Sequence, residues 1–311
     1  MNVPRLFVLA ILLFCSCDAI AQDNPKLDGV GIEANYLYGR IIRHTIKFTA
    51  PLPPSSSAFE LNFVQQTYGK KDWQQYRRYP LLGIGLTYID YGNDAVFGKC
   101  IGIYPNIQIM LIKGRKLEWT LRIGDGFGYV TRKYQKTSPV DTTNNAIGTH
   151  VNDFGIFMTD LRYHASKHLD IQVGANWTHI SNGDFHSPNL GVNFPGAHIG
   201  LRYFPVNSKP SKIPSDTREN ENKWLAHLRL GVAYNEENAP DSTVVASYIG
   251  SVSVSRLWNH NNKLFIGVDF AYHQNIYDWL SAARCMMPSG LKSLKIFVIV
   301  SASVISAFIK V

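Results

Sequence analysis

The chain has 311 residues, a formal net charge of +8 at pH 7 and a hydrophobic content of 45%, which suffices for one large domain or two small ones with a sizeable core. Its 4 cysteines are too few for the disulfide framework on which small secreted proteins depend. The positive charge suits an anionic surface, either nucleic acid or anionic lipid.

The start of the chain has the pattern of a secretory signal peptide, which we assign to residues 1–21. Arg5 precedes an uncharged apolar run from Leu6 to Cys17, and Ala19-Ile20-Ala21 supplies the small-x-small pattern that signal peptidase cleaves. An uncleaved anchor would be shorter than the about 20 residues of a membrane-spanning helix. Lipidation at Cys17 is a second alternative. Export favours lipid over nucleic acid as the anionic partner.

The exported part of the chain shows apolar residues at alternate positions over segments of about 9 to 11 residues, which is typical of β-strands. The clearest segments, in chain order, are Leu82–Tyr88, Leu117–Gly124, Ala197–Tyr203, Trp224–Tyr234 and Leu264–Tyr272. Polar, Pro- or Asn-rich connections mark loops at 51–57, 137–145, 181–189, 207–222 and 235–242. We count roughly 12 candidate strands, and roughly 8 to 14 fit a closed antiparallel barrel with an even strand number.

The ends of these segments favour a transmembrane β-barrel over a soluble β-sandwich, which would also alternate. Aromatic residues gather there, as girdles at the two bilayer interfaces require; they include Trp177, Tyr203, Trp224, Tyr234, Trp258 and Tyr272. The opposite faces carry charged residues and glycines, which fit the crowded polar interior of a narrow barrel. We therefore predict an all-β, antiparallel transmembrane barrel over residues 22–311.

The last segment, residues 285–311, fits this pattern least. Cys285 to Lys295 shows no strand alternation, and Ile296 to Ile309 is an uncharged run too short for a membrane helix. It is either an atypical closing strand or the product of an altered reading frame, and we assign it no function.

A His-x-Ser pair ends the predicted strand Ile171–Ser181. The odd positions of this strand are mainly apolar up to Trp177, and His179 and Ser181 continue the same face, which is expected to point toward lipid. An imidazole and a hydroxyl on one face of one strand are close enough to interact. A base that removes the hydroxyl proton and a nucleophile that attacks an ester are the minimum of a serine hydrolase.

The loop after this pair offers the remaining groups of such a site. Gly183 allows a backbone N–H to face a developing oxyanion, and Asn182 and Asn189 offer side-chain amide donors. The group that orients His179 through its other ring nitrogen is either Asn193 or a residue from a neighbouring strand. The alternative is a solvated histidine at the bilayer interface followed by ordinary Ser-Asn-Gly turn chemistry.

The run THISNGDFHSPNLGVNFPG, followed by AHIGLRY, resembles the bacterial lipid A 3-O-deacylases of the PagL type and the related acyloxyacyl hydrolases. Their pattern is His-x-Ser-Asn, a short loop and then Pro-Asn. The stretches GDGFGYVTRKY and NNAIGTHVNDFG are similar to the strand and loop before the motif, so the resemblance covers roughly Gly124 to Tyr203. It implies an outer-membrane barrel enzyme that hydrolyses an ester-linked acyl chain of lipid A at a site on its outer wall.

The resemblance also implies roles for individual residues. His179 would be the general base, Ser181 the nucleophile, and Asn189 with the backbone near Gly183 the oxyanion donors. The acidic residue that completes the family's triad falls on Asn193, which can hold a histidine tautomer but cannot stabilise an imidazolium by charge. This departure leaves open a slower enzyme, a Cys-His-Asn-like arrangement with serine as nucleophile, and a lost activity.

The expected partners are lipid A, as part of lipopolysaccharide, and membrane lipid, with no nucleic acid. We expect no cofactor and no metal, because a Ser/His esterase needs none and no residue cluster has metal-ligand spacing. His150, beside Asn152, is interpreted as a structural loop histidine. A catalytically silent outer-membrane barrel with a structural or transport role is the alternative function, and a soluble lipid-binding β-protein, with its apolar faces in a core, is a third.

Overall fold

The computed structural model describes residues 27–206, 211–213, 224–236, 243–259, 262–273, 297–299 and 304–306. The predicted signal peptide at 1–21 and most of the predicted tail at 285–311 lie outside these residues. The chain divides into two compact units, 1–183 with 188–215 and 184–187 with 216–311. Each unit contains its own β-sheet.

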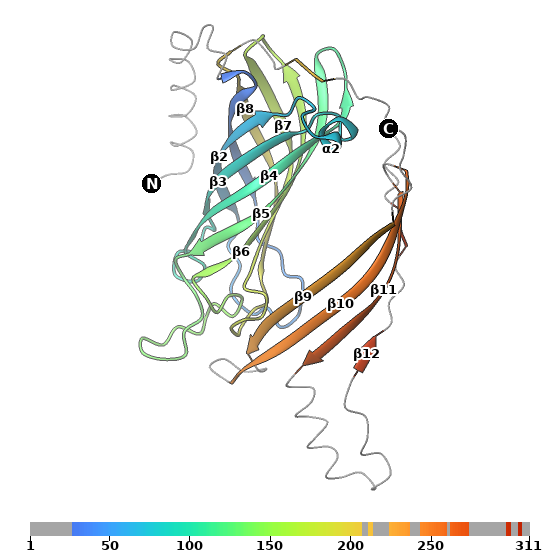
Figure 1. The fold of residues 1–311 in the computed structure, drawn as a ribbon. Helices are drawn as coiled ribbons and strands as arrows, with labels where there is room; N and C mark the ends of the chain where they lie inside the picture. The colour runs from blue at the N-terminus through green and yellow to red at the C-terminus, as the bar shows by residue number, and fades with distance from the viewer. Residues whose placement is uncertain are drawn as a thin grey trace. The chain divides into compact units, whose positions relative to one another are not determined.

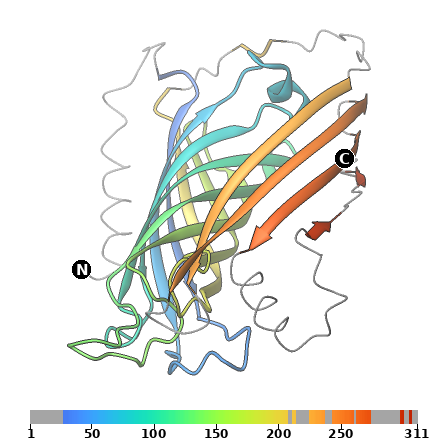
Figure 2. The same cartoon turned by 60° about the horizontal axis from the view of Figure 1, so that its bottom comes forward.

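The first unit contains a closed barrel in which each strand pairs with its sequence neighbour and β8 pairs back with β1 (Figures 1 and 2). Its strands are β1 (Val30–Gly39), β2 (Ser56–Gln66), β3 (Leu81–Asp90), β4 (Lys99–Lys113), β5 (Leu117–Val130), β6 (Val151–His164), β7 (Leu169–Ser181) and β8 (Val192–Tyr203). A short helix, α2 (Asp72–Tyr76), lies in the β2–β3 connection. Among the described residues, no helix is long and apolar enough to cross a membrane.

The second unit contains a separate antiparallel sheet with the order β12-β11-β10-β9, to which β13 adds by pairing with β11. Its strands are β9 (Trp224–Glu236), β10 (Val244–Asn259), β11 (Asn262–His273), β12 (Phe297–Ile299) and β13 (Val304–Ser306). The predicted strands Trp224–Tyr234 and Leu264–Tyr272 are therefore strands, but they lie outside the closed barrel.

The predicted antiparallel transmembrane barrel is confirmed, with eight closing strands, the lower end of the predicted range. The count of roughly twelve is corrected because alternation identifies a strand without identifying its partner. The register from Ile32↔Tyr203 to Gly39↔Gly196 closes the ring at β8. The predicted boundaries, a signal peptide followed by a barrel over 22–311, stay a prediction.

The barrel wall is apolar outside and polar inside. In β3, Leu82, Ile84 and Leu86 are exposed, whereas Thr87 is buried. The same alternation on the other strands gives an outer surface that matches hydrocarbon and an interior that satisfies polar groups. This inverted pattern contradicts the soluble alternative, in which the apolar faces would form the core.

Ion pairs between strands fill the middle of the barrel. The Arg122 guanidinium lies 2.8 Å from Glu60 and 2.7 Å from Glu33, and Arg162 lies 3.3 Å from Glu33. All four side chains have no solvent exposure. Buried charges are tolerated only when they are paired and hydrogen-bonded, so this network fixes the strands relative to one another.

An apolar layer fills the barrel interior at the end where β7 terminates. It is formed by buried side chains from strand ends and loops, including Leu37, Phe48, Ile89, Val130, Ile147, Phe154, Ile180 and Phe194. Dense packing of this kind allows little movement. The outer wall at this end of β7 therefore has a firm support.

Candidate active site

His179 and Ser181 lie at the end of β7 on its outward face. Trp177, before them on that face, is exposed, while the alternate residues Thr178 and Ile180 are buried in the barrel. His179 and Ser181 are themselves half-buried. The strand period thus places the imidazole and the hydroxyl on one face, as the sequence pattern predicts.

His179 has a side-chain partner on the neighbouring strand β8. The register pairs His179 with Asn193, and Nδ1 of His179 lies 2.8 Å from Oδ1 of Asn193. The indole Nε1–H of Trp177 donates to the same oxygen at 3.2 Å. Because an amide oxygen only accepts, Nδ1 of His179 carries the proton and Nε2 keeps its lone pair. His179 is therefore in the tautomer that a general base requires.

Gly191, which the sequence did not single out, makes room for the imidazole. Its φ is +74°, and a Cβ built there would lie 2.9 Å from Cε1 of His179 and 3.1 Å from the carbonyl oxygen of Ile180. Its N–H donates to the carbonyl oxygen of Ala146 at 3.0 Å, so the backbone is tied in place. A side chain at this position would displace the ring of His179.

The turn after β7 brings a backbone donor to the hydroxyl of Ser181. Gly183, with φ +64°, donates its N–H to Oγ of Ser181 at 3.4 Å. The N–H of Asn182 donates to Oδ1 of Asn189 at 2.9 Å, and Nδ2 of Asn182 donates to Oγ1 of Thr149 at 3.1 Å. The three predicted oxyanion residues, Asn182, Gly183 and Asn189, thus lie around one turn. The side chain of Asn189 stabilises this turn by accepting the hydrogen bond from the N–H of Asn182.

Two carboxylates lie on the outward face beside this pair, although no acidic residue stood at an obvious position in the sequence. Asp153 on β6 is the direct cross-strand partner of Ser181, and its carboxylate is close enough to Asp125 and to the imidazole of His179 for electrostatic interaction with both. Directly opposed residues have Cβ atoms about 5 Å apart, and diagonal neighbours about 7 to 8 Å apart. Only knowledge of the β6–β7 register could have found Asp153.

The predicted structural role of His150 agrees with its contacts. Its ring stacks on Tyr129 with centroids 5.5 Å apart, and its Nδ1 lies 2.8 Å from the carbonyl oxygen of Val130. Among the described residues, no group of three His, Cys, Asp or Glu side chains could hold a metal ion.

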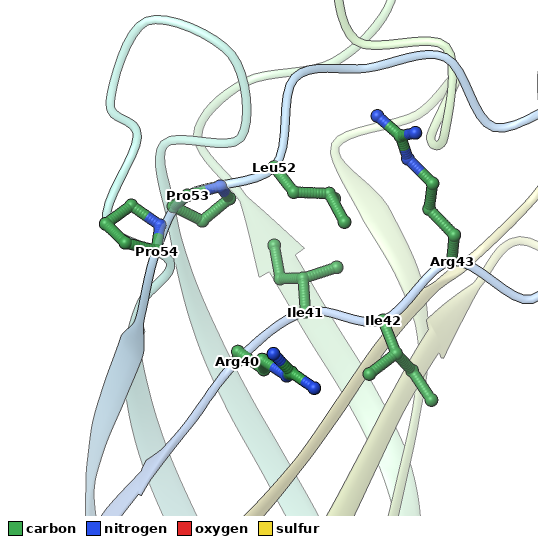
Figure 3. Close-up of a pocket in the computed structure, with 7 residues that line it drawn as sticks. All are labelled: Arg40, Ile41, Ile42, Arg43, Leu52, Pro53 and Pro54. Carbon is green, nitrogen blue, oxygen red and sulfur yellow. The ribbon is translucent and has the colours of Figure 1, made fainter.

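A pocket of about 380 Å³ opens beside the site, at the start of the β1–β2 loop (Figure 3). Ile41 and Leu52 turn toward each other in it, and the guanidinium groups of Arg40 and Arg43 stand at its edge. Ile42, between the two arginines, forms an isolated β-bridge with Asn193. The pocket therefore adjoins β8 at Asn193, the residue that contacts His179.

The model of one protein family, described as lipid A 3-O-deacylase (PagL), matches residues 57–202 of the chain. No curated protein matches the chain significantly.

Several solved structures are similar at low identity. Neisserial surface protein A is 9% identical, with a TM-score of 0.40, over 57% of this chain and 97% of that one. The outer membrane enzyme PagL is 15% identical, with a TM-score of 0.37, over 54% and 97%. The N-terminal β-barrel domain of Pseudomonas aeruginosa OprF is 9% identical, with a TM-score of 0.32, over 57% and 98%.

The family match covers β2 to β8 and contains the strand and turn that carry His179 and Ser181. With the closed barrel and its apolar outer wall, it confirms the predicted location in the outer membrane of a Gram-negative bacterium. The predicted resemblance to the PagL-type lipid A 3-O-deacylases is therefore confirmed, and residues 57–202 of this chain match the model of that family.

Proposed function

We propose that this outer-membrane protein of the lipid A deacylase type hydrolyses an ester-linked acyl chain of lipid A, with Ser181 as nucleophile and His179 as general base. The main support for the proposal is the 2.8 Å contact between Nδ1 of His179 and Oδ1 of Asn193. Ser181 lies on the same outward face of β7 as His179. The description of the matching family names the 3-O-linked chain, and we propose the same bond here.

The reaction follows from the tautomer of His179. Nε2 takes the proton of the Ser181 hydroxyl while Oγ forms a bond to the ester carbonyl carbon. The tetrahedral intermediate collapses as the ester C–O bond breaks, and His179 returns the proton to the sugar oxygen that leaves. A water molecule, deprotonated by His179, then attacks the acyl-enzyme, which releases the fatty acid and restores Ser181.

The oxyanion of the intermediate needs hydrogen-bond donors close to the nucleophile. The N–H of Gly183 is already 3.4 Å from Oγ of Ser181. We propose that Gly183 supplies a backbone donor, and that Asn182 and Asn189 supply side-chain donors or hold the turn that presents the backbone. Asn193 replaces the acidic member of the triad, so the imidazolium is oriented but receives no charge from that position.

The position of the site suits a substrate that never leaves the membrane. Exposed Trp177 lies just before the pair on β7, so an acyl chain in the bilayer can lie against an apolar wall with its ester near Ser181. The cationic edge of the neighbouring pocket, formed by Arg40 and Arg43, suits the anionic head group of lipopolysaccharide. We therefore propose a site on the lipid-facing wall.

The test is mass spectrometry of lipid A from a Gram-negative host that expresses the protein. Wild type is expected to remove one acyl chain, and Ser181→Ala and His179→Ala are expected to remove none. His168→Ala is the matched control, because His168 lies in the turn before β7, at the opposite end of that strand. Unchanged lipid A with a folded wild-type barrel would favour the silent outer-membrane barrel instead.

A further inference from the structure

The side chain of Asn193 has three partners on the outward face of the barrel. Its Oδ1 lies 2.8 Å from Nδ1 of His179 and 3.2 Å from Nε1 of Trp177. Its Nδ2 lies 3.0 Å from Nδ1 of His44, which is 149 positions away in the sequence. Asn193 is only 7% exposed, so these side chains fix how its amide is turned.

The chemistry of the partners determines the orientation of this amide. An indole N–H can only donate, so the atom that faces Trp177 has to be the amide oxygen. The amide nitrogen then faces His44, and since that nitrogen only donates, Nδ1 of His44 accepts with a lone pair. The proton positions on the two imidazoles, His44 and His179, are thus linked through one amide group, and the invariant N–H of Trp177 sets its orientation.

The catalytic tautomer depends on this orientation. With the amide turned by 180°, its NH₂ group would face His179, whose Nδ1 would have to accept. The proton of the neutral ring would move to Nε2, and His179 could not remove a proton from Ser181. A carboxylate has two equivalent oxygens and needs no such control. A site with Asn193 in place of an acid therefore requires a group that keeps the amide from turning.

We propose that His44 is a positioning residue that keeps the oxygen of Asn193 directed at His179. The inference rests on the proposed ester hydrolysis and deepens it. His44 is held where this role requires: Ile42, two residues before it, bridges to Asn193 through its N–H at 3.1 Å. On its other side, the His44 ring packs edge-on against buried Phe48, with centroids 6.3 Å apart. Trp177 assists as a second, invariant donor to the oxygen.

A double-mutant cycle tests the proposal. His44→Phe keeps a ring to pack against Phe48 but removes the acceptor, and Asn193→Asp removes the need for orientation. In the wild-type background, His44→Phe is expected to lower kcat about tenfold with little change in KM, the loss of roughly one hydrogen bond. In the Asn193→Asp background, the same substitution is expected to change kcat less than about twofold. His168→Phe is the matched control.

Equal losses in both backgrounds would overturn the proposal, because His44 would then support the loop and not the amide. No loss in the wild-type background would overturn it as well. A second measurement is independent of turnover: the ¹⁵N chemical shifts of His179 report which ring nitrogen is protonated. We expect Nδ1–H in wild type and a mixture of tautomers in His44→Phe. The same tautomer of His179 in both proteins would refute the role of His44, whether or not wild type is active. An inactive but folded wild type would refute the proposed deacylase activity instead.

Discussion

Replacing Asn193 by aspartate is expected to accelerate ester hydrolysis, because it puts a negative charge where a neutral amide now holds His179. Nδ1 of His179 lies 2.8 Å from Oδ1 of Asn193. When His179 accepts the serine proton it becomes a cation. A unit charge about 4 Å away stabilises that cation by about 1 kcal/mol in water and by about 4 kcal/mol at an effective dielectric constant of about 20. Asn193 is 7% exposed, which places the site between these limits.

The new carboxylate also loses hydration when it is buried, and this lowers the stability of the folded protein. The loss is the same before and during proton transfer, so it does not enter the activation barrier. Since about 1.4 kcal/mol corresponds to a tenfold change in rate, we expect kcat to rise about 10-fold to 100-fold in Asn193→Asp. The midpoint of urea unfolding is expected to fall.

The assay is the rate of fatty-acid release from lipid A in mixed micelles by the purified, folded barrel, followed by mass spectrometry. Asn93→Asp, in the β3–β4 loop, is the matched control for an added negative charge and is expected to keep the wild-type rate. An Asn193→Asp barrel that is folded and no faster than wild type would refute the reasoning. In that case Asn193 would not face His179 during proton transfer.

Three further substitutions test the surroundings of the site and the barrel interior. Gly191→Ala puts a Cβ 2.9 Å from Cε1 of His179, at a backbone φ of +74°. This variant is expected to lower kcat at least about tenfold in a folded barrel. Full activity would contradict the close approach of Gly191 to His179. Asp153→Asn removes a charge that acts on His179 and is expected to lower kcat about fivefold at low ionic strength, with a smaller effect in high salt; an effect independent of salt would point to packing instead. Arg122→Met leaves two buried glutamates without a shared cation and is expected to lower the free energy of unfolding by about 3 to 5 kcal/mol, measured by urea unfolding in lipid vesicles with tryptophan fluorescence. Exposed Arg115→Met is its control, and equal stability of the two variants would disprove the role of the network.

The outward position of His179 and Ser181 could be predicted from the sequence because strand geometry is local. Successive side chains point to opposite faces, so a run of apolar odd positions up to Trp177 fixes the face of the next odd positions. The same period predicted the apolar outer wall. Alternation could not count the strands that close the barrel, since strands β9 and β11 alternate as clearly as those of the ring.

The partners of His179 depend on which strands pair and in what register. Asp153 becomes important only because β6 places it opposite Ser181. His44 reaches Asn193 only because β1 closes the barrel against β8.

The sequence by itself therefore determined the class of the fold and the face of each strand, because these follow from a period of two along the chain. The two central residues of the candidate site were identified by the His-x-Ser motif and by its resemblance to the lipid A 3-O-deacylases. Only the tertiary structure decided where the ring closes, how the amide of Asn193 is turned and which side chains surround His179. The closure of the ring and the contact of His44 with Asn193 bring together strands distant in sequence. Asp153 and Asn193 come to Ser181 and His179 through the registers of the β6–β7 and β7–β8 hairpins, and the alternation within a single strand does not specify such a register.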